Sequence, residues 1–276
     1  MRTSNSQLYV SHHDSNSVTF VYESLNVSSH SFKLFFSYYE PYNDDELNIR
    51  NAGTYVFKTK NVKDSLKYPH KIVKVEADRM GGEVQQIVIT YEDELREKAY
   101  VKVKLREGVA PVEFDVHFSG LTQHDMEAII NFESLDIVNK EGSFFTDSNG
   151  LGIVKRTRKR QEIGGVIENF LSDAPVNYYP INKCLMIEDH QRQMLIMNDR
   201  PQGGSGYRGS RLELMFNRRV SSHDDLGMPE NLNEFARGAP IKTNHRYYLL
   251  LTEDRKELFK IYKQFSSQLT FPLQYF

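Results

Sequence analysis

The chain has 276 residues, of which 39% are hydrophobic and 26% are charged, an ordinary balance for a globular protein. Its 35 Lys and Arg residues and 37 Asp and Glu residues are mixed along the chain and give a formal net charge of -2. This balance excludes the broad basic field that nucleic acid binding requires, and it gives no support to binding at a membrane surface. No run of ~18 apolar residues is present, so no membrane-spanning helix is predicted.

The dominant pattern is a two-residue alternation of apolar and polar side chains, which predicts strands with one buried face and one wet face. In chain order, strands are predicted at 18–22, 32–39, 54–57, 72–75, 84–91, 99–106, 111–118, 150–154, 183–188, 194–197, 211–216 and 246–251. The alternation is clearest at 99–106 and 111–118, and the short segment between them predicts a hairpin with Gly108 at the bend.

One helix is predicted, at 253–265, with Thr252 as its expected N-cap. The apolar residues that recur there at helical spacing are Leu258, Ile261, Tyr262 and Phe265. Three polar or glycine-rich segments, 40–53, 201–210 and 224–234, predict loops between the strands.

Many strands, 17 Phe, 16 Tyr and few helices predict a mainly β fold. We expect a large antiparallel β-sandwich with at most one or two short helices. Residues 1–276 are expected to form a single domain, because all-β architectures often reach about 200–250 residues as one unit.

Candidate groups for catalysis within the chain are weak. A glycosidase needs two carboxyl groups held ~5–10 Å apart, but Asp224 and Asp225 are neighbours in a predicted loop, where adjacent side chains of an extended stretch point apart. His12 and His13 have no third metal ligand nearby in the sequence. The favoured interpretations are therefore surface charge for the acids and exposed or hydrogen-bonded side chains for the histidines.

Cys184 is the only cysteine, which excludes a disulfide within the chain and a zinc site built from several thiolates. It lies in a predicted strand, so a small buried hydrophobic side chain is favoured over a nucleophile. The glycine-rich segment from Gly203 to Gly206 is followed by Tyr207 and Arg208 and not by the G-K-[ST] of a phosphate-binding loop, which argues against nucleotide binding.

Several short motifs follow one another in a characteristic order. They read N-A-G-T-Y-V-F from Asn51, F-F-T-D-S-N-G from Phe144, N-Y-Y-P from Asn177, D-R-P-Q-G-G-S from Asp199, L-E-L-M from Leu212 and R-R from Arg218. Their order and spacing resemble the C-terminal half of the class II α-mannosidases, glycoside hydrolase family 38. The resemblance covers about residues 30–250 and is weaker outside that range.

The resemblance implies a supersandwich fold of the galactose-mutarotase-like type and a role in hydrolysing the α-mannosides of glycans. In that family the zinc ligands, the nucleophilic aspartate and the acid/base aspartate belong to an N-terminal domain, and no zinc motif like H-P-F-G-H-S occurs here. We therefore expect no catalytic residue, no metal ligand and no cofactor in this chain. The implied partners are an N-terminal catalytic domain or subunit, which binds the zinc of the complete enzyme, and mannose-containing glycans.

The resemblance also implies a substrate contact at Tyr55, which matches a tyrosine that lines the family's mannose site. A tyrosine suits that role, because its ring can stack on a sugar face and its hydroxyl can bond a sugar oxygen. The predicted substrate-binding residues in the glycine-rich segment are Gly203, Gly204 and Ser205.

A second family contact, an arginine, is expected in the loop after Arg219. An alignment without gaps places Asp224 on a family aspartate and Leu226 on the family's arginine, while Gly227 keeps the family's glycine. Either the chain has lost this contact, or the loop has shifted by one residue. Because it matches a family aspartate, Asp224 is predicted to bind substrate together with Tyr55, Gly203, Gly204 and Ser205.

The N-terminal sequence M-R-T-S-N-S-Q-L-Y lacks the apolar core of a signal peptide. The resemblance implies that the chain begins in the middle of a longer protein. It also implies that the complete enzyme belongs to the lysosome, the vacuole or another lumen of the secretory pathway.

Three interpretations stay open at this point. The chain is the C-terminal β-sandwich of an α-mannosidase, as a fragment or a subunit; or it is a stand-alone, non-catalytic carbohydrate-binding module; or it is a structural interaction domain. The first predicts an exposed apolar face that belongs against an absent domain. The basic run 155–160 is expected to be a solvated strand edge, with a contact to the absent domain as its alternative.

Overall fold

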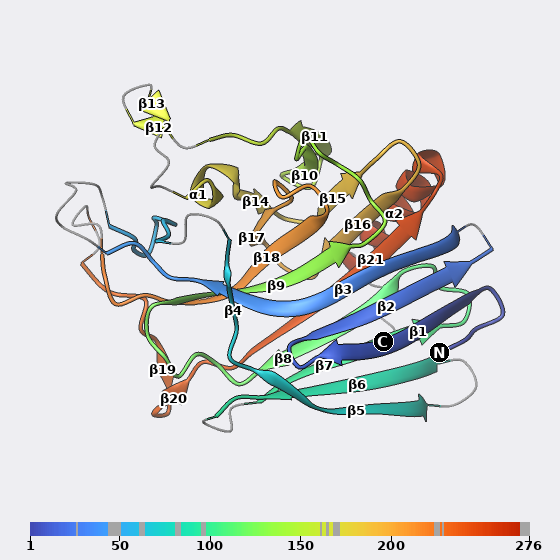
Figure 1. Cartoon of the computed structure of the whole chain (residues 1–276), viewed down its shortest axis with the longest axis horizontal. Helices are drawn as coiled ribbons and strands as arrows, with labels where there is room; N and C mark the ends of the chain where they lie inside the picture. The colour runs from blue at the N-terminus through green and yellow to red at the C-terminus, as the bar shows by residue number, and fades with distance from the viewer. Residues whose placement is uncertain are drawn as a thin grey trace, which may run out of the picture.

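The computed structural model describes residues 1–25, 27–43, 51–60, 64–80, 84–94, 98–160, 162–163, 166–167, 172–223, 227 and 229–270. Within these ranges, two large antiparallel sheets face each other and form a sandwich (Figure 1). The antiparallel β-sandwich predicted from the sequence is therefore confirmed.

The first sheet has eight strands. In spatial order they are β1 (Ser6–Asp14), β2 (Ser17–Ser24), β3 (Val27–Tyr39), β9 (Met126–Ser134), β18 (Arg211–Arg219), β17 (Gln202–Ser205) and β14 (Tyr179–Ile181), with β4 (Leu66–Lys67) paired to β3. Strands far apart in the sequence are neighbours here, since β9 lies between β3 and β18.

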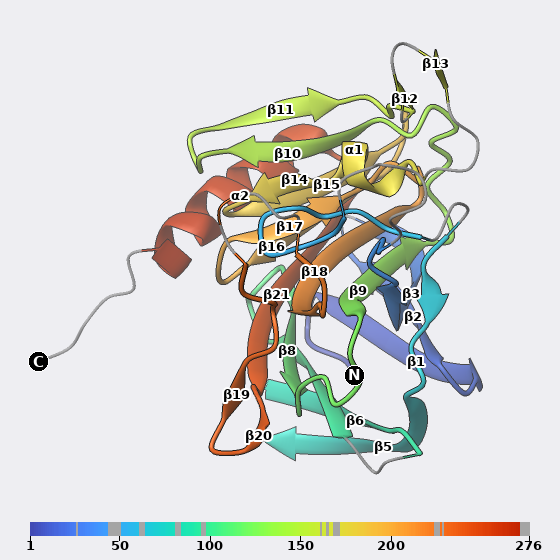
Figure 2. The ribbon, with the colours of Figure 1, turned by 90° about the vertical axis from the view of Figure 1, so that its left-hand side faces the viewer.

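The second sheet has nine strands. In spatial order they are β11 (Gly152–Arg156), β10 (Phe144–Ser148), β15 (Cys184–Glu188), β16 (Gln193–Asn198), β21 (Thr243–Thr252), β8 (Val112–Phe118), β7 (Lys98–Arg106), β6 (Val84–Glu92) and β5 (Lys71–Met80). Two short hairpins lie outside the sheets, β12 (Glu162–Ile163) with β13 (Val166–Ile167), and β19 (Phe235–Ala236) with β20 (Ala239–Pro240). The β19–β20 hairpin projects from the body of the molecule (Figure 2).

The core lies between the two sheets and is rich in aromatic rings. Phe20 and Phe32 of the first sheet stack at 5.0 Å between centroids, and Phe114 of the second sheet meets Phe20 edge-on at 5.8 Å. Phe132 of β9 contacts the same Phe114 edge-on at 5.2 Å. Such pairs add about 0.5–1.5 kcal/mol each to the free energy of burial, so they hold the sheets together across the layer.

A second apolar cluster lies on the outer face of the second sheet, where α2 (Arg255–Thr270) covers it (Figure 2). Leu258 and Tyr262 of α2 are buried in this cluster with Leu195 of β16, which confirms the predicted helix. The predicted cap was wrong: Asp254, and not Thr252, accepts the N–H groups of the first turn, at 2.8 and 3.3 Å. Neither α2 nor the one-turn helix α1 (Ala174–Asn177) is both long and apolar enough to cross a lipid bilayer.

Every predicted strand except 54–57 overlaps a strand of the structure. Residues 54–57 form a turn, although their β-branched and aromatic side chains favour a strand. The segment 201–210, predicted as a loop, contains β17, whose backbone pairs with β14 and β18. Glycine content predicted a loop there, but the glycines serve close packing within the sheet.

The sequence pattern also missed the central strand β9. Its residues are buried on both faces, with Glu127 and Asn131 buried beside the apolar residues. A strand covered on both sides shows no alternation, so the two-residue pattern could not reveal it. The strands β1, β10 and β14 were missed as well.

Two buried histidines make the fold sensitive to acid. Burial lowers the pKa of His30 in β3 and of His245 in β21 to about 4 each. An unfolded histidine titrates near pH 6.5, so the unfolded chain binds more protons as the pH falls. The stability that these groups contribute is complete above pH ~6.5 and is lost as the pH falls toward 4.

We expect the free energy of unfolding to drop by about 2–3 kcal/mol per histidine between pH 7.5 and pH 4.5. His30→Gln can keep a hydrogen bond to Ser134, whose Oγ lies 3.0 Å from His30 Nε2, but it cannot titrate. Urea unfolding at both pH values should show a smaller loss for this variant than for the wild type. An equal loss in both proteins would contradict the assignment.

Candidate functional site

Tyr55 lies on a tight turn at one end of the molecule, and 75% of its surface is exposed. Gly53 and Val56 close the turn through two backbone hydrogen bonds, Gly53 N to Val56 O at 3.0 Å and Val56 N to Gly53 O at 3.3 Å. The side chain therefore projects from a closed turn and not from a sheet face. This is the placement that a residue contacting a bound ligand needs.

One arginine holds this turn in place. Arg218, near the end of β18, donates from Nη1 to Thr54 O at 3.1 Å and from Nη2 to Gly53 O at 3.1 Å and Val56 O at 3.3 Å. The three carbonyl groups of the turn therefore converge on a single guanidinium group.

Glu127 of β9 fixes the same guanidinium group through an ion pair. Arg218 Nε lies 2.7 Å from Glu127 Oε2, and Nη2 lies 3.1 Å from Oε1. The Glu127 side chain is completely buried, and burial raises its pKa although Arg218 acts in the opposite direction. A buried carboxylate paired in this bidentate way fixes the orientation of the arginine, so the position of the Tyr55 turn is set by the sheet itself.

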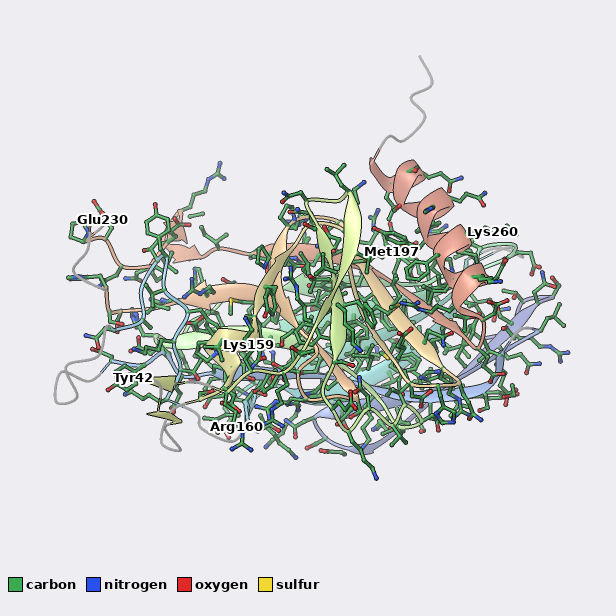
Figure 3. All side chains as sticks on the ribbon, turned by 90° about the horizontal axis from the view of Figure 1, so that it is seen from above. Tyr42, Lys159, Arg160, Met197, Glu230 and Lys260 are labelled. Atoms are coloured by element: carbon green, nitrogen blue, oxygen red, sulfur yellow. The ribbon has the colours of Figure 1, made fainter. Side chains whose placement is uncertain are left out.

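The chain around 220–233 also reaches the Tyr55 turn. Ser222 Oγ donates to Ala52 O at 2.9 Å, and Thr54 Oγ1 donates to Glu230 O at 3.1 Å. Figure 3 shows Tyr42 and Glu230 at one end of the molecule, far from Lys260 on α2. Ser222 and Glu230, which flank the predicted Asp224 loop, thus contact the segment that carries Tyr55, whereas Asp224 and Leu226 themselves lie outside the described residues.

Gly203, Gly204 and Ser205 lie elsewhere on the first sheet, in β17. Gly204 pairs with Leu214 of β18, about 13 Å along that strand from Arg218. A Cβ atom at Gly204 would lie 2.7 Å from Ile181 Cδ1 and 3.3 Å from the carbonyl oxygen of Glu213. Ser205 is fully buried and donates to Asn177 O at 2.7 Å. These contacts give Gly204 and Ser205 a structural role, whereas a Cβ atom at Gly203 would make only ordinary contacts, at 3.6 Å or more.

The L-E-L-M motif supplies a buried carboxylate on the outer face of the first sheet, at Glu213. Its Oε2 accepts the hydroxyl groups of Tyr39 at 2.9 Å and Tyr178 at 2.8 Å. Its Oε1 accepts Nε of Arg208 and of Arg211, both at 3.1 Å. With four donors on two oxygens and only 1% of its side chain exposed, Glu213 is a structural centre and is not available as a nucleophile.

The F-F-T-D-S-N-G motif has a similar structural explanation. Asp147 is buried, and its Oδ1 accepts the backbone N–H groups of Asn182, Lys183 and Cys184 at 2.9–3.1 Å. Its Oδ2 accepts Gly150 N at 2.8 Å. The motif therefore ties the β10–β11 hairpin to the start of β15.

The N-Y-Y-P motif joins three segments through the buried side chain of Asn177. Its Oδ1 accepts Lys159 N at 2.8 Å, and its Nδ2 donates to Lys159 O and Asp173 O at 2.7 Å each. This fixes the end of the basic run 155–160 beside α1. The lysine and arginine side chains of that run are mainly exposed, as predicted.

Another pair of neighbouring carboxylates, Glu113 and Asp115 of β8, lies on one face of the strand. Both are ion-paired with Lys104, and Asp115 also pairs with Arg246 at 2.7 Å. Burial alone would raise the pKa of Asp115, but the hydrogen bonds from Lys104 and Arg246 lower it below its usual value. A general acid needs a raised pKa, so Asp115 does not have the properties of a glycosidase acid, and the ion pairs with Lys104 and Arg246 occupy both carboxylates.

No group of three His, Cys, Asp or Glu side chains that could hold a metal ion occurs within the described part of the chain. The described residues therefore offer no set of side chains for the zinc ion that the family resemblance implies for the complete enzyme. Cys184 is buried, as predicted, and burial raises its pKa to about 12, which leaves it protonated and unreactive at neutral pH.

Sequence reasoning missed the residues that build this site. Glu127 and Asn131 interrupt the apolar run 126–132, and Glu213 interrupts the run 212–216. An acidic residue inside an otherwise apolar segment is a signal for a buried, paired carboxylate, because an unpaired one would be too costly to bury. That signal was present in the sequence and identifies both carboxylates.

Comparison with known proteins places the fold and the sequence in one family. The sequence profile described as "Glycosyl hydrolases family 38 C-terminal domain" matches residues 4–226. Lysosomal alpha-mannosidase of Mus musculus is 38% identical over 114 residues, which cover 41% of this chain and 11% of that protein. A probable alpha-mannosidase of Arabidopsis thaliana is 28% identical over 209 residues, which cover 72% of this chain and 19% of that protein.

The fold agrees with solved structures. The crystal structure of an alpha-mannosidase from Enterococcus faecalis superposes with a TM-score of 0.67 at 13% sequence identity, over 98% of this chain and 31% of that chain. A second protein of glycosyl hydrolase family 38 from the same organism gives a TM-score of 0.64, over 98% of this chain and 32% of that chain. The chain thus spans about a third or less of the length of these relatives.

The Arg218–Glu127 pair leads to a stability prediction. Arg218→Ala should lower the free energy of unfolding by about 3–5 kcal/mol, because it leaves Glu127 buried without a counter-charge. Glu127→Leu combined with Arg218→Leu removes both charges and should cost less. Both proteins lose the guanidinium bonds to the turn, so chymotrypsin should cleave after Tyr55 faster than in the wild type.

Urea unfolding and timed proteolysis measure the two effects separately. Wild-type stability and wild-type cleavage in Arg218→Ala would show that the arginine does not hold the turn.

Proposed function

We propose that this chain, which belongs to the glycosyl hydrolase family 38 C-terminal domain family, is the C-terminal β part of an α-mannosidase. In this proposal it forms one wall of the mannose-binding site. The observation that carries the proposal is the exposed side chain of Tyr55 on a turn that Arg218 and Glu127 hold rigidly. A rigid turn favours binding, because little conformational entropy is lost when a ligand is bound.

Tyr55 suits a sugar ligand. Its ring offers a flat apolar face for the C–H groups of a pyranose, and its hydroxyl can donate to or accept from a sugar hydroxyl. The hydroxyl has no hydrogen-bond partner among the described residues, so a ligand would not have to displace one. The role of Tyr55 is therefore to bind and orient the substrate.

The reactive groups come from another domain in this proposal. Retaining hydrolysis needs a nucleophilic carboxylate and an acid/base carboxylate, and the described carboxylates examined above are saturated with cations or hydrogen bonds. A bound zinc ion would supply Lewis-acid chemistry and orientation of the sugar, and its ligands belong to that other domain. The matching N-terminal catalytic domain is accordingly the proposed partner, and the chain is proposed to be inactive without it.

The proposal extends to location. The mammalian relatives are named lysosomal alpha-mannosidases, and we assign the complete protein to a lysosomal, vacuolar or other secretory lumen. His30 and His245 are expected to make the chain less stable in an acidic lumen. Binding of the other domain would add stability and so offset this loss.

The alternative, a stand-alone carbohydrate-binding module, predicts paired aromatics along a shallow groove. Among the described residues, exposed large hydrophobic side chains lie on several different elements, such as Tyr9 on β1, Val73 on β5 and Leu151 beyond β10. This distribution favours neither a broad docking face nor a long binding groove, so the two functions must be separated by experiment.

The experiment measures hydrolysis of p-nitrophenyl α-mannoside. The chain alone, with or without zinc, should show no turnover, and mixing it with a separately produced family 38 N-terminal catalytic domain should restore activity. In the mixture Tyr55→Ala should lower kcat/KM about 10- to 100-fold, the loss expected for one hydrogen bond and one stacking contact. Tyr55→Phe should recover the part that is due to stacking.

Tyr9→Ala is the matched control, because Tyr9 is also an exposed tyrosine, on β1. Turnover by the chain alone that rises in proportion to its concentration would overturn the proposal. Equal activity of the Tyr55→Ala and Tyr9→Ala mixtures would remove Tyr55 from the substrate site.

A further inference from the structure

A groove of about 600 Å³ lies on the outer face of the second sheet. The residues that line it are Lys98, Tyr100, Lys102, His117, Phe118, Ser119, Lys242 and Asn244. Val101 and Val103 of the same strand are buried in the core between the sheets, so the side chains of Tyr100 and Lys102 point outward. The groove is therefore separate from the Tyr55 turn, which is held by the first sheet.

The register of the strands assembles the floor of this groove. Tyr100 of β7 pairs with His117 of β8, which pairs with Asn244 of β21, so the three side chains form a row across the sheet. A hydrogen bond of 3.0 Å joins His117 Nδ1 to Asn244 Oδ1 and fixes the imidazole ring. Because Oδ1 can only accept, Nδ1 carries the proton and Nε2 is the nitrogen left for a ligand.

Positive charge surrounds this row. Lys98 and Lys102 lie two residues before and after Tyr100 on the same face, each about 7 Å away along the strand. Lys242 lies immediately before β21, the strand that carries Asn244. None of the residues lining the groove is acidic, and within the described part of the chain neither Lys102 nor Lys242 has an ion-pair partner. Lys98 has one distant partner, Glu92, at 3.9 Å.

The acidic residues nearby are otherwise engaged. Asp115 of β8 lies opposite Lys102 of β7 in the strand register, but its carboxylate forms ion pairs with Lys104 and Arg246. The positive charge of Lys102 is therefore not neutralised within the groove. A concave surface lined by lysine ammonium groups without ion-pair partners attracts anions.

The groove also offers hydrogen bonds. The Ser119 hydroxyl oxygen is buried at its border and has no hydrogen-bond partner among the described residues. An unsatisfied buried hydroxyl costs free energy that a ligand can recover. Together with Asn244 and the aromatic ring of Tyr100, it gives the combination of polar and flat apolar groups that a sugar ring requires.

We propose that this groove binds a sugar that carries a phosphate or sulfate ester. The oxyanion lies between Lys102 and Lys242, the sugar ring lies on Tyr100, and Asn244 and Ser119 bond the hydroxyl groups. This site is a second one on the chain and does not depend on the Tyr55 turn or on a catalytic domain.

Calorimetric titration of the chain at low salt tests the proposal, with glucose 6-phosphate, glucose 6-sulfate, glucose, inorganic phosphate and AMP as ligands. One of the two sugar esters should bind at least about tenfold more tightly than glucose and than inorganic phosphate, since only the ester uses both the lysines and the ring. The tighter of the two esters identifies the oxyanion. Added salt should weaken ester binding, because the lysines are partly exposed.

Two double variants separate the groove from the general charge of the protein. Lys102→Glu with Lys242→Glu should weaken ester binding about tenfold or more. Lys256→Glu with Lys260→Glu makes the same change of net charge at two exposed lysines of α2, of which Figure 3 labels Lys260, and should leave ester binding unchanged. Tyr100→Ala should weaken the ester but not inorganic phosphate.

Three results would overturn the proposal. The first is equal affinity for the esters and for glucose or inorganic phosphate. The second is equal binding by the two double variants, and the third is tighter binding of AMP than of either ester. Near-ultraviolet and far-ultraviolet circular dichroism of each variant verifies that the fold is retained.

Discussion

One buried ion pair, Arg218 with Glu127, positions the turn that carries Tyr55. The guanidinium group of Arg218 bonds both the completely buried carboxylate of Glu127 and the carbonyl groups of the turn that carries Tyr55. Glu127 lies on β9, the strand at the centre of the first sheet. The centre of the first sheet therefore sets the position of an exposed aromatic side chain. Because a buried charge without its partner is costly, Arg218 cannot leave Glu127 without a large loss of stability, and it therefore stays in place to bond the turn.

The motifs that make the sequence recognisable share this logic. Asp147, Asn177 and Glu213 are buried polar groups whose hydrogen bonds hold hairpins and loops against the sheets. Residues of this kind cannot be replaced singly without leaving unpaired donors or acceptors. The likeness to glycosyl hydrolase family 38 thus rests mainly on scaffold residues, and it identifies the fold more directly than it identifies the chemistry.

The sequence predicted the fold well wherever one face of a strand meets water. The alternation at 99–106 is an example, since Val101 and Val103 enter the core while Lys102 and Lys104 remain outside. It failed at β9, which is buried on both faces, and at 54–57, where three carbonyl bonds to Arg218 favour a turn over a strand. Periodicity reports local burial, and it carries no information on a contact made by a residue more than a hundred positions away.

The site was only partly predictable for the same reason. Tyr55 was identified from a resemblance. The apolar run around Glu127 marks it as a buried, paired carboxylate, but no local pattern reveals that its partner is Arg218 or that Arg218 positions Tyr55. Gly203, Gly204 and Ser205 were predicted to bind substrate from the family resemblance and from a glycine-rich segment that was expected to be a loop, whereas the structure places them in β17, where Gly204 and Ser205 are closely packed. A closely packed strand and an exposed loop can both be rich in glycine, so only the three-dimensional structure distinguishes the two.

The most direct measurement is a crystal structure of this chain assembled with a family 38 catalytic domain and a bound, uncleaved mannoside. The account predicts that the hydroxyl or the ring of Tyr55 contacts the sugar, that the turn stays bonded to Arg218, and that the carboxylates facing the glycosidic bond belong to the other domain. A sugar bound far from Tyr55, or a pair of carboxylates from this chain at the glycosidic bond, would contradict it.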